Sequence, residues 1–176
     1  MPGLARFWSR YVMIWLVVLC GGSRYNVHGL ENIADVTASD RVILVANHRS
    51  FFDFYVIMML NFRHTAISNR ILFPVRSTFF YDRPIGSLVN LIMSGMAMFP
   101  PIMRDKSKRA FNRYAVQRVM LELEQPGMVI GFHPEGTRNK SDNPYQLLPG
   151  RPGVGEIIIH ADPSVKIIPV FAVGMG

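Results

Sequence analysis

The chain has 176 residues, of which 49% are hydrophobic and 18% are charged. This composition supplies the core of one globular domain and leaves too little for two domains of ordinary size. Lysine and arginine number 19 against 12 acidic residues, and the net charge of +7 favours an anionic partner: a phosphate, a lipid surface or nucleic acid. The single cysteine, Cys20, excludes an internal disulfide and a cysteine-ligated metal site, and is typical of a reducing compartment.

The N-terminal segment contains an apolar run, YVMIWLVVLCGG, at residues 11–22. About 20 apolar residues are needed to cross a bilayer, so we do not expect this run to span one. Because Phe7, Trp8 and Arg10 precede it, we predict a helix that enters one leaflet, with its aromatic and basic residues among the headgroups. Two alternatives are a helix buried in the core and a signal peptide with a cleavage site near the Gly-Gly pair.

Beyond Gly22, apolar runs of strand length alternate with longer runs of helix length. We predict strands at residues 41–47, 64–68, 96–100, 128–132 and 165–173. We predict helices at residues 50–60, 85–95, 107–124 and 153–161. This alternation predicts an α/β fold with a mixed, largely parallel sheet flanked by helices. We therefore divide the chain into a membrane-associating helix, 1–25, and an α/β domain, 26–176.

Local signals set several details of these elements. Ser50 is expected to cap the helix at 50–60, and Gly95 to close the helix at 85–95. The polar residues 139–152 predict a loop. The helix at 107–124 has a basic face and an opposite, apolar face that carries Phe111, Tyr114, Ala115 and Val119.

A histidine and an aspartate, His48 and Asp53, lie five positions apart in the stretch ANHRSFFDFYVI. They could not meet on one continuous helix, where such positions point about 140° apart. With Ser50 as the cap, His48 precedes the helix and Asp53 lies in its first turn, so the imidazole can fold back onto the carboxylate. Asp53 would then fix the tautomer and leave the other ring nitrogen as a base. Free N–H groups at the helix start would stabilise negative charge, and simple capping by Asp53 is the alternative.

Two further stretches carry polar residues directly after predicted strands. In GFHPEGTRNK, Glu135 can bind hydroxyls or orient a cation, Gly136 allows a ligand close to the backbone, Thr137 adds a hydroxyl, and Arg138 offers a planar fork for phosphate. The alternative is a polar turn. In FPPIMRD, Arg104 follows a strand end, where a solvated or ion-paired arginine is the alternative.

Together these stretches resemble the glycerolipid acyltransferase family, which contains the 1-acylglycerol-3-phosphate and glycerol-3-phosphate O-acyltransferases. NHRSFFD is similar to its first motif, a histidine and an aspartate separated by four residues, and FPPIMRD to its arginine-bearing second motif. HPEGTR is similar to the third motif, with His133 where the family usually has phenylalanine, and IIPV to the fourth. The resemblance covers residues 42–171 in the family's order.

The resemblance implies a reaction and a role for each motif. His48, held by Asp53, would take the proton of an acceptor hydroxyl, which attacks the thioester of an acyl-CoA or an acyl-carrier protein. The acceptor is expected to be 1-acylglycerol-3-phosphate, giving phosphatidate; glycerol 3-phosphate or another lysophospholipid is the alternative. No metal or other cofactor is expected, nor an acyl-enzyme, because the chain has no G-x-S-x-G elbow. Acceptor binding is expected from Arg104, Glu135, Gly136, Thr137 and Arg138.

The expected location is the cytoplasmic face of a phospholipid membrane. A nucleic-acid-binding module is a rival interpretation of the charge, but no recognition motif supports it. A catalytically silent membrane protein with this fold is another, since the chain stops at Gly176, soon after the fourth motif, as a truncated domain would. A zinc site is a third, although no two of the histidines have paired ligand spacing. Those histidines are His28, His48, His64, His133 and His160.

Overall fold

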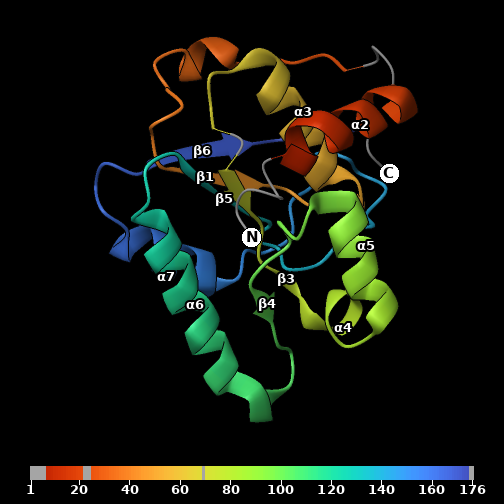
Figure 1. Cartoon of the computed structure of the whole chain (residues 1–176), viewed down its shortest axis with the longest axis vertical. Helices are drawn as coiled ribbons and strands as arrows, with labels where there is room; N and C mark the ends of the chain where they lie inside the picture. The colour runs from red at the N-terminus through yellow and green to blue at the C-terminus, as the bar shows by residue number, and fades with distance from the viewer. Residues whose placement is uncertain (1–6, 22–24, 69, 175–176) are drawn as a thin grey trace.

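The computed structural model describes residues 7–21, 25–68 and 70–174 (Figure 1). Four strands form its central sheet in the order β2-β5-β1-β6. Every strand pair in these residues is parallel, so the α/β class is confirmed, while the antiparallel pairs that a mixed sheet would contain are not seen there. The four strands are β1 (Val42–Ala46), β2 (Arg70–Leu72), β5 (Met128–Phe132) and β6 (Lys166–Val170).

The two central strands are apolar along their whole length because helices cover both faces of the sheet. All five residues of β5 are buried, as are four of the five in β1. Pro169 lies in β6, and it is tolerated there because an edge strand donates hydrogen bonds on one side only. The continuous apolar runs of the sequence therefore predicted the strands that lie deepest.

Alternate residues of the strands belong to two separate cores, one on each face of the sheet. Leu44 packs with Phe54 in the first core, whereas Ile43 packs with Val119 in the second. The first face carries α3 (Asp53–His64), against which η1 (Ser9–Met13) and α2 (Ile14–Gly21) pack. The second face carries α6 (Arg109–Leu123) and α7 (Pro152–His160).

A small second sheet and two short helices complete the first side. Strands β3 (Val75–Arg76) and β4 (Pro101–Ile102) pair in parallel. In the sequence between these strands, α4 (Ser77–Phe80) is followed by α5 (Pro84–Ser94), and the two helices pack on each other. α5 ends at Gly95, which has the left-handed conformation, as predicted. Single 3-10 turns are η2 (Leu30–Ile33) and η3 (Lys106–Lys108).

Two predicted strands are wrong because side chains or helix ends use their backbone groups. At 64–68, the N–H and hydroxyl of Thr65 both donate to the Asn61 carbonyl and end α3, so the strand starts only at Arg70. At 96–100, the buried side chain of Asn90 binds both the N–H and the carbonyl of Met98. These residues therefore form a turn, and pairing begins at Pro101.

Two helix details also need correction. α3 begins at Asp53, so Ser50 is not its N-cap; the Ser50 hydroxyl instead accepts from the N–H of Phe52. On α6, Ala115 and Val119 are buried with Leu123, but Phe111 and Tyr114 are more than half exposed. The apolar stripe that reaches the core is therefore narrower than the sequence pattern indicated.

The described part of the N-terminal segment packs on the domain. Met13 is buried in the core of the first face, whereas Tyr11, Trp15 and Leu19 are exposed. Among the described residues, no helix combines the length and the apolar character needed to cross a membrane. The division into segments 1–25 and 26–176 stays a prediction.

Candidate active site

The first and third motifs meet because neighbouring parallel strands end at the same edge of the sheet. Val45 of β1 is in register with Phe132 of β5. His48 follows the end of β1 by two residues, and His133 follows β5 directly. The predicted polar segments therefore lie side by side at the carboxyl edge of the sheet, where ligands bind in open α/β sheets.

The predicted contact between His48 and Asp53 is present. Nδ1 of His48 lies 2.9 Å from Oδ2 of Asp53, whose carboxylate is only 1% exposed. The same oxygen accepts the backbone N–H groups of Arg49 and Ser50 at 2.6 and 2.8 Å. With Nδ1 donating to the carboxylate, Nε2 of His48 is the basic nitrogen, and no described group hydrogen-bonds to it.

The turn before α3 uses its own backbone N–H groups on Asp53. The sequence indicated that free N–H groups at the start of the helix would stabilise negative charge, and no contact of the described residues tests this for a substrate. The N–H groups of Arg49 and Ser50 bind Asp53, so they hold the base in place. The negative charge that they stabilise is that of the buried carboxylate itself.

Glu135 is a second buried carboxylate, and it joins the two motifs. Its Oε2 accepts the backbone N–H of His48 at 3.2 Å, and its Oε1 accepts the N–H of Leu148 at 3.0 Å. The backbone N–H of Asn139 in turn donates to the carbonyl of His48 at 2.6 Å. Glu135 therefore braces the loop that carries the histidine, and its predicted contact with an acceptor stays a prediction.

His133 was left without a role by the sequence, and the structure places it against His48. The two imidazole rings stack, with their centroids 4.1 Å apart and their planes inclined by 7°. The ring centroid of Phe73 lies 4.8 Å from that of His133. Nδ1 of His133 donates to the carbonyl of Ala46 at 3.0 Å. Burial, and then repulsion from a charged His48, lower the pKa of His133 from 6.5 to about 4, so this ring is neutral at physiological pH.

The other predicted acceptor-binding residues of the third motif are Gly136 and the residues that follow it. Gly136 has a left-handed backbone (φ 62°), and Thr137 and Arg138 are exposed beside it. The exposed Arg104 follows β4, whose Ile102 is in register with Arg76. Arg76 was not predicted: its Nη2 donates to the Gly136 carbonyl at 2.7 Å, and no local pattern marks it as different from other arginines. The guanidinium of Arg76 therefore lies beside the third motif, which itself carries Arg138.

Comparison with known proteins identifies the chain's relatives. Residues 24–173 match the Acyltransferase family. The chain belongs to this family. It is 27% identical over 156 residues to the chloroplastic 1-acyl-sn-glycerol-3-phosphate acyltransferase LPAT1 of Arabidopsis thaliana, a match that covers 87% of this chain and 37% of the relative. It is also 27% identical over 151 residues to the chloroplastic 1-acyl-sn-glycerol-3-phosphate acyltransferase BAT2 of Brassica napus, covering 86% of this chain and 38% of the relative. The chain therefore spans less than two fifths of these acyltransferases.

The loop after the third motif of this Acyltransferase-family chain is ordered by polar side chains. Nη2 of Arg49, from the first motif, donates to the carbonyl of Ser141 at 2.8 Å, and the side chain of Asn139 donates to the carbonyl of Gln146 at 2.6 Å. The predicted loop at 139–152 is confirmed up to residue 151, because Pro152 begins α7. Arg49 and the N–H of Asn139, which donates to the His48 carbonyl, fasten it to the histidine turn.

Three potential metal ligands meet at this site, but their rings are not arranged for a shared ion. Ligand atoms of His48, Asp53 and His133 lie within 4.8 Å of one another. An imidazole binds a metal through a lone pair in its own plane. Because the two rings are stacked and nearly parallel, their lone pairs cannot converge on one point. The cluster is therefore better described as a base, His48, that is held by Asp53 and packed against His133.

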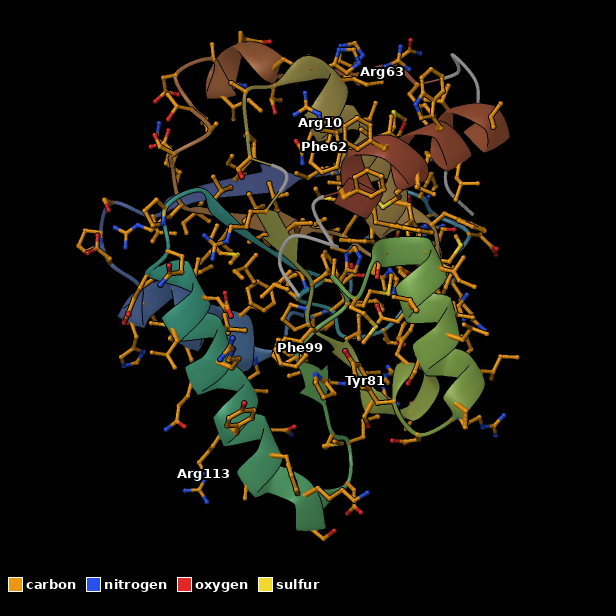
Figure 2. The ribbon with its side chains drawn as sticks, viewed as in Figure 1. Arg10, Phe62, Arg63, Tyr81, Phe99 and Arg113 are labelled. Atoms are coloured by element: carbon orange, nitrogen blue, oxygen red, sulfur yellow. The ribbon has the colours of Figure 1, made fainter. Side chains whose placement is uncertain are left out.

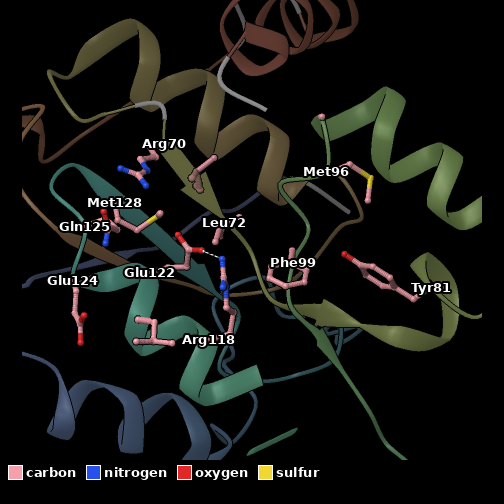
Figure 3. Close-up of a pocket in the computed structure, with 13 residues that line it drawn as sticks. Arg70, Leu72, Tyr81, Met96, Phe99, Arg118, Glu122, Glu124, Gln125 and Met128 are labelled. Atoms are coloured by element: carbon pink, nitrogen blue, oxygen red, sulfur yellow. Dashed lines mark hydrogen bonds and ion pairs between the residues drawn. The ribbon is translucent and has the colours of Figure 1, made fainter. Parts of the chain in front are cut away.

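A pocket of about 730 Å³ opens elsewhere, between β2, α6 and the turn at 95–99 (Figure 3). Leu72, Phe99 and Met128 contribute apolar walls, and an ion pair between Arg118 and Glu122 lies at its side. The volume is typical of small-molecule sites. None of its lining residues belongs to the histidine cluster or the third motif. The candidate active site is therefore assigned from the motif residues and lies outside this pocket.

Replacing Glu135 by glutamine should destabilise the protein. An amide has one accepting oxygen, so its NH₂ group would face the N–H of His48 or of Leu148. We expect the free energy of unfolding to fall by about 1–3 kcal/mol in a denaturant titration. Glu124→Gln, at the exposed end of α6, is the control and should change it by less than about 0.5 kcal/mol. Equal stabilities of the two variants would contradict the bracing role.

The lowered pKa of His133 should make the protein less stable in acid. Between pH 6.5 and about 4 the unfolded state binds a proton at this residue and the folded state does not. The free energy of unfolding should therefore fall over this range, by up to about 3 kcal/mol more than in His133→Phe, which keeps a ring but cannot titrate. Denaturant titrations at several pH values test this. Parallel curves for the two proteins would show that His133 titrates normally.

Proposed function

We propose that this chain transfers a fatty acyl group from a thioester donor to a hydroxyl of a glycerophosphate lipid precursor. The observation that carries the proposal is the histidine–aspartate pair of the first motif. In it, His48 is held by the buried Asp53 and lies beside the third motif. Membership of the Acyltransferase family and the names of the two plant relatives support it.

In the proposed reaction, Nε2 of His48 takes the proton of the acceptor hydroxyl. The oxygen attacks the thioester carbonyl carbon, the C–S bond of the tetrahedral intermediate breaks, and the imidazolium returns its proton to the leaving thiolate. Asp53 holds the ring in the required tautomer and stabilises the imidazolium by its charge. The stacked, neutral His133 adds no second positive charge beside it.

The proposed acceptor is 1-acylglycerol-3-phosphate, and its product is phosphatidate. The exposed Arg104 and Arg138 would bind the phosphate, Thr137 would bind a glycerol oxygen, and Gly136 allows close approach to the backbone. Arg76 adds a further guanidinium next to Gly136. Glycerol 3-phosphate or another lysophospholipid is the alternative acceptor, and acyl-CoA and acyl-carrier protein are the two proposed donors. The thioester is the only cosubstrate that the reaction needs.

We also propose that the protein works at the cytoplasmic face of a phospholipid membrane, with which the N-terminal segment associates. The exposed aromatic residues of η1 and α2, Tyr11 and Trp15, are of the kind found at membrane interfaces. The alternative of another class is a non-catalytic membrane-binding protein with this fold.

The proposed activity is tested by acceptor-dependent thiol release in detergent micelles. Acyl-CoA and acyl-carrier-protein donors are each offered with lysophosphatidate or glycerol 3-phosphate. Removing the base in His48→Ala should lower the rate about 10²- to 10⁴-fold. The matched control is His160→Ala, because that exposed histidine lies on α7 and should leave the rate unchanged.

Each result decides between the proposals. The acceptor and donor that support turnover identify the substrates. Full activity of His48→Ala would rule out this histidine as the base. Absence of release from the wild type with every donor and acceptor would favour the non-catalytic membrane protein.

A further inference from the structure

We infer that the exposed apolar face of α5 is a bilayer-docking surface that, together with η1 and α2, sets the candidate active site against the lipid that carries its acceptor. The inference rests on the proposed function in that the acceptor is a membrane lipid. It goes beyond the N-terminal segment by assigning membrane contact to an element inside the α/β domain.

α5 packs Val89 and Met93 on the core beside two buried polar residues, and its outer face is apolar, whereas a helix on a water-facing surface exposes polar residues. Asn90 and Ser94 are fully buried, and they hydrogen-bond to each other. Ile85, Leu88 and Ile92 are spaced three and four residues apart, share one face, and are 65%, 52% and 46% exposed. Contiguous exposed side chains of this size mark a surface that another apolar phase covers.

The face of α5 continues onto the N-terminal helices. η1 contacts α5, and α2 lies on the same side of the molecule, away from α6 (Figure 1). There Tyr11, Trp15 and Leu19 are exposed as well. Two apolar helices that lie across one surface, neither long enough to span, are the arrangement of a protein that rests in one leaflet.

The charges around this face favour an anionic bilayer over a second protein copy. Residues 84–94 contain no charged side chain, and residues 7–21 contain only Arg10. At the margin, Arg83 precedes α5 beside Asp82, and Arg63 is exposed near the end of α3. Arg10 and Arg63 lie at the end of the molecule that carries α2 and α3 (Figure 2). An uncharged apolar helix face, together with an N-terminal segment whose charged side chain is an arginine, matches acyl chains below anionic headgroups.

Aromatic side chains connect this face to the candidate active site. α4 packs so closely on α5 that a side chain at Gly86 would meet the Phe79 carbonyl at 1.7 Å. Phe79 is half exposed, and its ring packs edge-on against that of Phe51, with the ring centroids 6.2 Å apart. Phe51 contacts the exposed Phe52, which directly precedes Asp53. These aromatic contacts connect α5, through α4, to the turn that carries His48.

Vesicle flotation with the full chain tests the inference independently of catalysis. The double variant Leu88→Gln, Ile92→Gln should partition at least about tenfold more weakly into phosphatidylcholine–phosphatidylserine vesicles than the wild type. Ile159→Gln is the matched control, because Ile159 is 79% exposed on α7, on the other face of the sheet, and should bind as the wild type does. Unchanged flotation of the double variant would overturn the inference.

A direct probe covers the case in which the double variant folds poorly. An environment-sensitive fluorophore is attached to a cysteine at position 88 or at position 159, in a Cys20→Ser background. On vesicle addition the fluorophore at 88 should shift to the blue and be quenched by acyl-chain nitroxide lipids, while that at 159 should not. No shift at 88 in protein that floats would place membrane contact in the N-terminal helices alone. A wild-type dimer that dissociates in the double variant, with no change in flotation, would assign the face to a second copy.

Activity separates this inference from the proposed function. The double variant should lose acyl transfer to lysophosphatidate embedded in vesicles and keep it toward a short-chain lysophosphatidate that is monomeric in water. If the wild type floats through α5 but transfers no acyl group to either substrate, the docking surface stands and the proposed function fails.

Discussion

The buried carboxylate of Asp53 is the interaction on which the rest of the site depends. A charge removed from water must be compensated by hydrogen bonds, and this one receives three: the His48 ring and the N–H groups of Arg49 and Ser50. Those bonds curl the chain back between β1 and α3. The turn whose N–H groups hydrogen-bond to the aspartate is therefore the same turn that orients the base.

A second buried carboxylate, that of Glu135, also holds backbone N–H groups at the site, from the loop after the neighbouring strand β5. It holds the backbone of His48 and of Leu148, so the loops after β1 and β5 are fixed to each other. The motif residues thus fall into two groups. Asp53 and Glu135 are internal and build the frame, whereas Gly136, Thr137 and Arg138 are exposed, as the proposed binding of an acceptor requires.

The sequence predicted most of what depends on local patterns. The buried strands β1 and β5, the glycine stop of α5 and the contact of His48 with Asp53 all follow from apolar runs, backbone preferences and a spacing of five residues. The stacking of His133 on His48 and the bracing by Glu135 could not be predicted, because they join residues 85 to 87 positions apart through strand register. The wrong strand at 96–100 has a similar cause: nothing local shows that Asn90 will bind the backbone of Met98. The exposure of Phe111 and Tyr114 depends on how far α6 extends beyond the sheet, which is a property of the whole fold.

The most direct test of this account is a double-mutant cycle on acyl transfer, since Asp53 is held to act only through His48. The kcat is measured for the wild type, Asp53→Asn, His48→Ala and the double variant, with folding checked by circular dichroism. We predict that Asp53→Asn lowers kcat in the wild type and has no further effect once His48 is removed. The same fold-loss in both backgrounds would show that the aspartate acts independently of the histidine, and would contradict the account.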